Sequence, residues 1–421
     1  MEKIKIALRS KTVRQSAITS FATIINGLLG VAFYILTARL FGPENFGILV
    51  VALTTLTLIS DIATIGTDTG IVKFVGQHYE RDRDRALKFL KLGLKIKLIV
   101  GVVVLLLGWF IAPLVANNLF VKPELVVPLR FAIAGSFVTL LFTFATSSLQ
   151  AIQKFWTWGA VNISSNALRL VLIIVLALLG ILNVDSALAS YIVCVLLGFF
   201  VSLLFLPNFF KAKNEGTLAK EFLHYNKWVA VFVMIAAVSG RLDTFLSTRL
   251  LSLTEVGIYG VAVGLATIGS QVVAGITTVV APKLASMDSD RKAIEYLKKL
   301  QLLVLMLSVI AVVLGSIAGY VVIPMFYGST YAPSIAPFIV LLAAQAIFLL
   351  SIPAHSSVVF YFGYPKLFVY ISLVHFAIIG GLGWFMITNF GIMGAAYTVL
   401  AGNISNLLIP GVWVLNKFSK K

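Results

Sequence analysis

Residues 38–53 read ARLFGPENFGILVVAL, and residues 248–263 read TRLLSLTEVGIYGVAV. Aligned without a gap, the two stretches are identical at six of sixteen positions. Each stretch joins the end of one long apolar segment to the start of the next through turn-forming residues. The chain has 421 residues, so the copies are offset by half its length. The repeat predicts two halves of the same topology, which we expect at residues 1–210 and 211–421.

The composition indicates that lipid is the main solvent of this chain. Hydrophobic residues make up 60% of the sequence, charged residues only 12%, and the mean hydropathy is +1.02. Soluble domains carry about 25% charged residues, so this chain has too little polar material to cover them. The apolar segment that follows the basic N-terminus is too long for a signal peptide. We therefore expect it to be the first membrane helix.

A membrane-spanning helix needs about 20 mainly apolar residues. The sequence predicts an all-α polytopic membrane protein with about twelve transmembrane helices, arranged as two six-helix bundles. The predicted spans are residues 16–40, 46–75, 93–116, 126–150, 156–181, 187–209, 228–250, 256–281, 301–326, 334–361, 366–388 and 391–415.

The net charge of +17 comes from basic residues whose distribution along the chain predicts how the protein is oriented in the membrane. Most of the 33 lysines and arginines lie at the two termini or in alternate loops, whereas the opposite helix ends contain only Arg39, Lys122, Arg130 and Arg249. Basic loops stay in the cytoplasm, so this bias predicts a plasma (inner) membrane protein with both termini cytoplasmic. No basic domain with interleaved aromatic residues exists, so nucleic acid is not an expected partner.

Polar side chains recur on one face of the predicted helix 46–75. They are spaced three or four residues apart, as Thr54, Thr57, Asp61, Thr64 and Asp68. This spacing puts them on one stripe, and ionisable groups at membrane depth usually face a partner or a cavity. Asp61 and Asp68 are therefore candidate ion-coupling residues.

Span 156–181 carries the most informative cation. Arg169 lies near mid-span and shares a helix face with Asn162 and Asn166, which makes it the leading candidate for contact with an anion. Asn26 and Gln271 are further candidates for lining a substrate cavity. The alternative interpretation of such amide side chains is that they join helix to helix.

The remaining intramembrane charges have competing interpretations. Arg241 and Asp243 are two residues apart and do not face each other on a helix. Asp243 is the third ion-coupling candidate, and Arg241 is a further anion contact or forms a structural ion pair, for example with Asp61. Arg39 and Arg249 lie at outer helix ends, where they contact substrate or extend to the interface. Spans 93–116, 187–209 and 301–326 are nearly free of polar stripes, which favours contact with lipid.

Several chemistries lack their signatures in the sequence. It contains no Walker motif, no metal-ligand cluster and no nucleophile elbow, so we expect no enzymatic activity, catalytic residue, metal or cofactor. A membrane-embedded glycan polymerase, the least favoured alternative, needs a large external loop with clustered acids and arginines. The predicted external loops are too short for one.

The junction ARLFGPENFG at residues 38–47 resembles the oligosaccharide flippases of the polysaccharide biosynthesis family. These are the Wzx-type exporters of the multidrug/oligosaccharidyl-lipid/polysaccharide superfamily. Residues 241–259 and the turn GYPK at 363–366 resemble the corresponding helix junctions of that family. The resemblance implies a V-shaped transporter that works by alternating access between two six-helix bundles.

The resemblance also implies a cargo and partners. Such a protein flips an oligosaccharide linked to polyprenyl phosphate or diphosphate from the cytoplasmic to the outer leaflet, for surface polysaccharide biosynthesis. Cavity cations meet the phosphates and acidic sugars, a role carried over to Arg169 and Arg241, then to Arg39 and Arg249. A glycan polymerase or ligase of the same pathway is an expected partner, besides membrane lipid. The alternative is an ion-coupled exporter of drugs or organic cations from the same superfamily.

Overall fold

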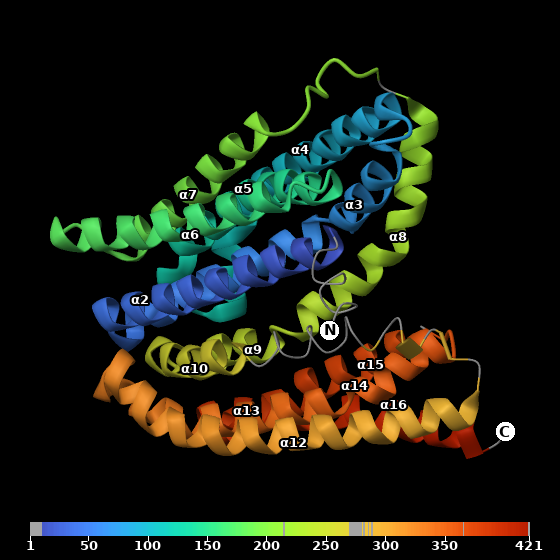
Figure 1. Ribbon diagram of the computed structural model, residues 1–421. Helices are drawn as coiled ribbons and strands as arrows, with labels where there is room; N and C mark the ends of the chain where they lie inside the picture. Colours follow the sequence, from blue (N-terminus) through green and yellow to red (C-terminus); the bar gives the residue numbers. More distant parts are fainter. Residues whose placement is uncertain are drawn as a thin grey trace. The chain divides into compact units, whose positions relative to one another are not determined.

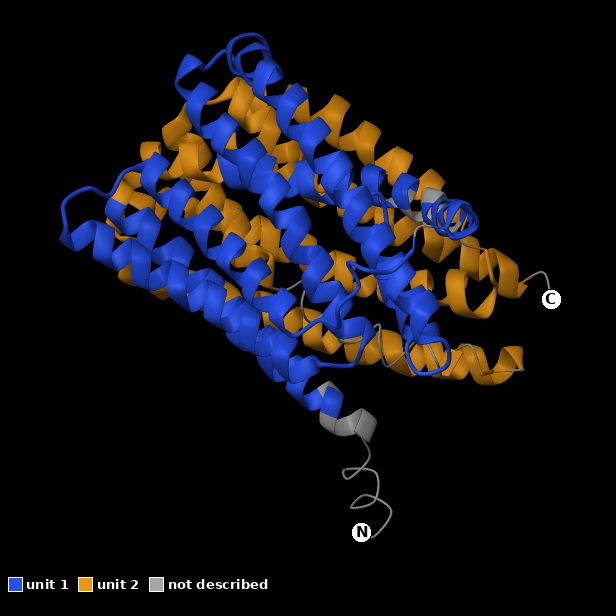
Figure 2. Cartoon of the chain, turned by 90° about the horizontal axis from the view of Figure 1, so that it is seen from above, with its two compact units in different colours: residues 1–40, 52–237 blue, residues 41–51, 238–421 orange. Residues whose placement is uncertain are grey.

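The computed structural model describes residues 11–213, 215–268, 280, 283–284, 286–287, 289–364 and 366–419. Regular structure within these ranges is helical, with no strand (Figure 1). The chain forms two compact units, which Figure 2 colours separately. Unit 1 is Met1–Leu40 with Ala52–Ala237, and unit 2 is Phe41–Val51 with Val238–Lys421.

Unit 1 is a bundle of long helices joined by short turns. Its elements are α2 (Lys11–Ala63, of which residues 41–51 belong to unit 2), α3 (Thr67–His78), α4 (Arg83–Leu114), the π-helical turn η1 (Val115–Phe120), the 3₁₀ turn η2 (Pro123–Leu125), α5 (Val126–Ala151), α6 (Phe155–Leu178), α7 (Val184–Leu204) and α8 (Gly216–Ser239).

Unit 2 combines long and short helices. Its elements are α9 (Leu242–Leu250), α10 (Leu253–Ala266), α12 (Asp290–Val322), η3 (Ile323–Tyr327), η4 (Ser329–Ser334), α13 (Ile335–Leu350), α14 (Ile352–Ser356), η5 (Ser357–Tyr361), α15 (Lys366–Ala377), η6 (Ile378–Leu382) and α16 (Gly383–Ser419).

The described residues include eight helices that are long and apolar enough to cross a membrane. Two of them contain two predicted spans each, because α2 is kinked at Gly42 (φ 71°) and α16 at Gly391 (φ 57°). The eight therefore cover every predicted span except 228–250 and 256–281. The predicted all-α, polytopic membrane fold is confirmed, with a helix count of about twelve.

The outer surfaces of these helices are apolar. On α4, Phe110 is 75% exposed, and on α7 Leu204 is 81% exposed. Many other large hydrophobic side chains of α4, α7 and α12 are also exposed. Exposed apolar surface of this extent is incompatible with water. Such a surface is expected if the predicted spans 93–116, 187–209 and 301–326 contact lipid.

Two predicted spans are interrupted. Span 46–75 breaks where α2 ends at Ala63, and α3 starts at Thr67 after Ile65 (φ 47°) and Gly66 (φ 69°). This break means that the prediction of one continuous helix was wrong here. A positive φ at a β-branched residue such as Ile65 is also strained. Span 228–250 is likewise two helices, because α8 ends at Ser239 and α9 starts at Leu242.

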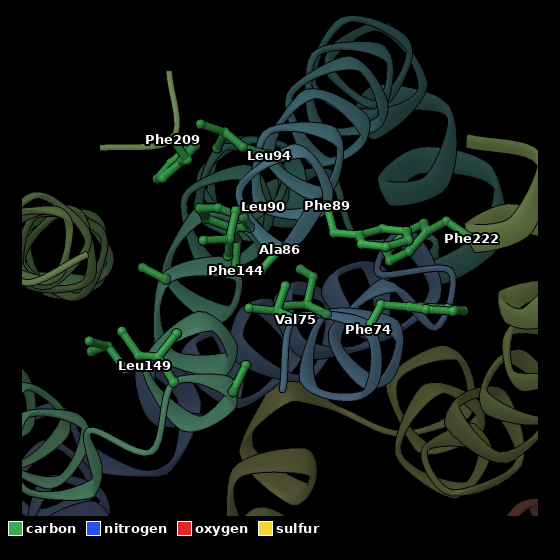
Figure 3. Packing of buried hydrophobic residues seen from close by; sticks show 14 of the residues in the cluster. Phe74, Val75, Ala86, Phe89, Leu90, Leu94, Phe144, Leu149, Phe209 and Phe222 are labelled. Atoms are coloured by element: carbon green, nitrogen blue, oxygen red, sulfur yellow. The ribbon is translucent and has the colours of Figure 1, made fainter. Parts of the chain in front are cut away.

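Helix α8 packs within unit 1, which extends to residue 237. Phe222 of α8 is fully buried, and its ring centroid lies 5.8 Å from that of Phe74 on α3 and 6.1 Å from that of Phe89 on α4. Figure 3 shows these rings in the buried cluster, together with Phe144 and Phe209. Residues 216–227, predicted as loop, are therefore helical and packed.

Ion pairs at the basic end of α4 reinforce this attachment. The guanidinium of Arg85 lies 2.9 Å from the Glu221 carboxylate, and Lys88 Nζ lies 3.2 Å from the Glu215 carboxylate. Hydrogen bonds from the Thr217 hydroxyl and from Lys88 hold the pKa of Glu215 below its ordinary value. Both glutamates are exposed, and water screens ion pairs at the surface, so the buried rings supply most of the attachment.

The repeated junctions pack against each other inside unit 2. A Cβ built on Gly47 would lie 2.0 Å from the Leu253 carbonyl oxygen, and one on Gly257 would lie 1.9 Å from the Pro43 carbonyl oxygen. Shifting Pro43 and Gly47 by 210 residues gives Leu253 and Gly257. The contact is therefore reciprocal under the sequence repeat, which is what two structurally equivalent copies produce.

Candidate anion-binding site

Arg169 is buried in the interior of unit 1. It lies on α6, and only 8% of its surface is exposed. Its guanidinium carbon lies 4.2 Å from the ring centroid of Phe33 on α2 and 4.7 Å from that of Tyr191 on α7. The two aromatic faces attract the cation and hold it in place between three helices.

The guanidinium of Arg169 is not neutralised within the described residues. The salt bridges found there do not include it, and its Nε is buried without a hydrogen-bond partner. A buried charge without an opposite charge is costly. An anion from outside the chain would lower this cost, which makes Arg169 a candidate anion contact.

A cavity of about 220 Å³, with both polar and apolar lining residues, lies beside this cation. Its walls come from α5, α6 and α7, and its lining residues are Thr139, Phe142, Asn162, Ser165, Asn166, Arg169, Tyr191, Cys194 and Val195. Sites for drug-sized ligands measure about 300–1,000 Å³. This cavity therefore suits one charged group, such as a phosphate or a carboxylate, and is too small for a whole oligosaccharide.

Three predicted amide side chains gather near Arg169. Asn162 and Asn166 line the cavity, and the Asn166 amide donates a 2.9 Å hydrogen bond to Asn26 Oδ1 on α2. The Asn162 amide donates to the Trp158 carbonyl one turn earlier in α6. Asn166 thus also joins two helices, so the ligand-contact and helix-joining interpretations of these amides are compatible.

The other predicted cations do not line this cavity. Arg39 is exposed near the Gly42 kink, while the half-buried Arg241 and Arg249 belong to unit 2. Gln271 lies outside the described residues. Arg169 is the predicted arginine that lines this cavity, and a role in substrate binding for Arg39, Arg241 and Arg249 stays a prediction.

The three candidate ion-coupling carboxylates have different surroundings. Asp61 is half-buried on α2. Asp68 pairs with the buried Lys97 at 2.5 Å. Asp243 is buried on α9 and accepts a 2.6 Å hydrogen bond from the hydroxyl of the fully buried Tyr259 on α10. No group of described His, Cys, Asp and Glu side chains has the arrangement of a metal site.

Sequence reasoning missed two parts of this picture. Phe33 and Tyr191, which enclose Arg169, are aromatic residues in apolar helices, and no local pattern distinguishes them from lipid-facing ones. Lys97, near the start of the predicted span 93–116, was not singled out from the sequence, yet it is 1% exposed. Its partner Asp68 lies 29 positions earlier, a separation that no helical periodicity reveals.

Comparisons with known proteins agree with this architecture. The sequence model of the family described as polysaccharide biosynthesis protein matches residues 12–288. No curated protein sequence matches the chain. Among solved structures, an inward-facing multidrug resistance transporter of the MATE family and MOP superfamily is 15% identical, with 98% of this chain and 99% of that chain covered and a TM-score of 0.77.

Two further structures are informative. The lipid II flippase MurJ, in an inward closed conformation, is 17% identical, with 96% of this chain and 89% of that chain covered and a TM-score of 0.77. A MOP superfamily transporter from Pyrococcus furiosus, described as having a binding pocket of reversed polarity, is 14% identical, with 97% and 96% covered and a TM-score of 0.63. At these identities the likeness establishes a shared fold.

Proposed function

Because the chain belongs to the polysaccharide biosynthesis protein family, we propose that it is a flippase for an oligosaccharide linked to polyprenyl phosphate or diphosphate. It moves this cargo from the cytoplasmic to the outer leaflet of the plasma (inner) membrane by alternating access, with both termini in the cytoplasm. The observation that carries the proposal is Arg169, a buried cation without an opposite charge among the described residues, on the wall of a small cavity.

The physics of the bilayer divides such a cargo into two parts. A glycan cannot enter hydrocarbon without losing its hydrogen bonds to water, so the head group must cross through a polar interior. The polyprenyl tail stays in lipid, where the apolar outer faces of α4, α7 and α12 provide a compatible surface. A cavity that holds one anionic group fits the phosphate at the junction of glycan and lipid.

Export of drugs or organic cations is the second candidate, since the likeness to a MATE transporter has the same TM-score as the likeness to MurJ. A site for organic cations needs carboxylates or aromatic faces open to the ligand. The lining of this cavity contains no carboxylate. Arg169 occupies the faces of Phe33 and Tyr191, and its charge would repel a cation near the remaining aromatic residue, Phe142. This chemistry favours an anionic cargo.

The test is transport by Arg169→Ala in proteoliposomes loaded with a fluorescent polyprenyl-diphosphate-linked glycan. Hydrogen bonds to charged groups contribute about 1.5–3 kcal/mol, so we expect transport to fall about 10- to 100-fold. Arg169→Lys keeps the charge without the planar fork of donors, and its rate should lie between those of wild type and Arg169→Ala.

Arg130→Ala is the matched control. Arg130 also stacks on an aromatic ring in unit 1, with its guanidinium carbon 5.0 Å from the Trp109 ring centroid, but it does not line the cavity. Full transport by Arg169→Ala would refute the site. Resistance to cationic dyes in cells that express the protein, without glycan translocation, would support the exporter instead.

A further inference from the structure

The Lys97 ammonium is enclosed by oxygen atoms inside unit 1. Lys97 lies on α4 and is 1% exposed. Its Nζ donates to Asp68 Oδ1 at 2.5 Å, to Thr143 Oγ1 at 2.7 Å and to Thr64 Oγ1 at 3.3 Å. An ammonium has three N–H donors, and here each has an acceptor.

The hydroxyl groups around Lys97 are fixed by hydrogen bonds of their own. Thr64 donates to Asp68 Oδ2 at 2.7 Å, and Thr143 donates to the Leu140 carbonyl at 3.1 Å. Because both hydroxyl protons are used in this way, both oxygen atoms direct lone pairs toward Nζ. The site is therefore built to surround a positive charge.

The site lies at the break between α2 and α3. Thr64 follows the end of α2 directly, and Asp68 is in the first turn of α3. The chain turns between them through Ile65 and Gly66, both with positive φ. A simple ion pair between two helices does not require a strained break. In membrane transporters, broken helices place backbone and side-chain oxygen atoms around bound monovalent cations.

The chemistry of the oxygen atoms points the same way. One carboxylate and two hydroxyl groups are hard donors of the kind that hard cations such as Na⁺ prefer. Asp68 retains 28% exposure of its side chain, so the protein does not fully enclose the carboxylate. Lys88 lies near the basic end of α4, and at 1.5 Å per residue Lys97 lies about 13 Å farther along the helix. Lys97 is therefore inside the predicted span 93–116.

We propose that Lys97 is a tethered cation, whose ammonium occupies a monovalent-cation site formed by Asp68, Thr64 and Thr143. The wild-type site is filled by its own side chain and does not take up Na⁺. Shortening Lys97 vacates a pocket with one negative charge and two hydroxyl groups, which then binds Na⁺. This inference concerns ion binding and does not depend on the identity of the transported cargo.

The test is the binding of radioactive ²²Na⁺ to purified protein, with melting temperatures measured in NaCl and in N-methyl-D-glucamine chloride of equal ionic strength. We expect Lys97→Ala to bind about one Na⁺ per chain and to melt at a higher temperature in NaCl, since a bound ligand stabilises the folded state. Wild type should show neither effect. The double variant Lys97→Ala/Asp68→Asn should also show neither, because it lacks the carboxylate.

Further variants make the test decisive. Lys97→Met fills the pocket with an apolar side chain and should bind no Na⁺, whereas Thr143→Val added to Lys97→Ala should weaken Na⁺ binding by about tenfold. If Lys97→Ala is recovered only from Na⁺-containing buffer, this supports the proposal. Two outcomes would overturn it. One is that Lys97→Ala protein is lost equally in both buffers while Lys97→Met protein is recovered. The other is that Lys97→Ala binds no more Na⁺ than wild type.

Discussion

At the scale of the residue, the two buried cations Lys97 and Arg169 have different partners. Lys97 has an opposite charge and a full set of acceptors. Arg169 has aromatic faces but no carboxylate within the described part of the chain. An internally satisfied charge has no interaction left to offer a cargo. This difference is why we propose Arg169, and not Lys97, as the group that contacts a ligand.

The sequence predicted the Arg169 site better than it predicted the Lys97 site. Arg169, Asn162 and Asn166 lie on one helix, so helical spacing was enough to group them. Lys97 and Asp68 come from different helices, and only tertiary packing brings them together. Counting basic residues for topology gave no information about burial, because the positive-inside rule treats every lysine near a helix end alike.

Asp243 provides a residue-scale prediction in unit 2. Replacing Tyr259 with Phe removes the hydroxyl that donates to the Asp243 carboxylate and leaves that buried group short of a partner. Losing a hydrogen bond to a charged group costs about 1.5–3 kcal/mol. We expect chemical denaturation in detergent to show this decrease in the free energy of unfolding.

Tyr320→Phe is the control for Tyr259→Phe. Tyr320 is 63% exposed on α12, so its replacement should change the stability by less than about 0.5 kcal/mol. Equal stability of the two variants would show that the Tyr259–Asp243 hydrogen bond does not stabilise unit 2.

At the scale of the element, apolar length was predicted well and interruptions were not. The Gly42–Pro43 turn was expected to separate two helices, and a kink is found at Gly42. The break at Ile65 was missed because isoleucine carries no turn signal and is strongly apolar. The first turns of α8 were missed because Lys220, Glu221 and Asn226 lower the local hydropathy, although Phe222 between them is fully buried.

The paired glycines give an element-scale prediction. Alanine at Gly47 or Gly257 would place a methyl group about 2 Å from a backbone carbonyl oxygen, which cannot move aside as a side chain can. We expect each variant to lose stability at the upper end of the about 1–3 kcal/mol that overpacking costs, as measured by melting in detergent. The two losses should be similar, because the contact is reciprocal.

Gly27→Ala provides the comparison for these variants. No atom lies within 4 Å of a Cβ built at Gly27 on α2, so its replacement should stabilise the helix by about 0.5–1 kcal/mol. If Gly47→Ala were as stable as Gly27→Ala, the close packing of the two junctions would be refuted.

At the scale of the whole molecule, the family resemblance seen at residues 38–47 is confirmed by the family match over residues 12–288. The prediction succeeded because this junction carries several constraints at once: a helix end, a turn and a close contact that only glycine permits. The division into units was harder to predict. It depends on which bundle α8 packs against, and hydropathy contains no information about that choice.

The membrane topology is a whole-molecule prediction. Single cysteines introduced into a Cys194→Ser background should react with an impermeant maleimide according to their side. We expect Asp185→Cys to react in intact cells, and Lys213→Cys and Lys417→Cys to react only after permeabilisation, because the positive-inside rule predicts that the basic loops are cytoplasmic. Reaction of Lys417→Cys in intact cells would contradict the predicted orientation.

The proposed anion cavity contains its own chemical reporter. Cys194 is the single cysteine of the sequence, it is 1% exposed, and it lines the same cavity as Arg169. Alkylation of this thiol therefore measures how often the cavity opens in the wild-type protein, with no engineered label. A cargo analogue that fills the cavity should slow the alkylation. The half-time of alkylation, measured by mass spectrometry, then reports how much of the cavity is occupied.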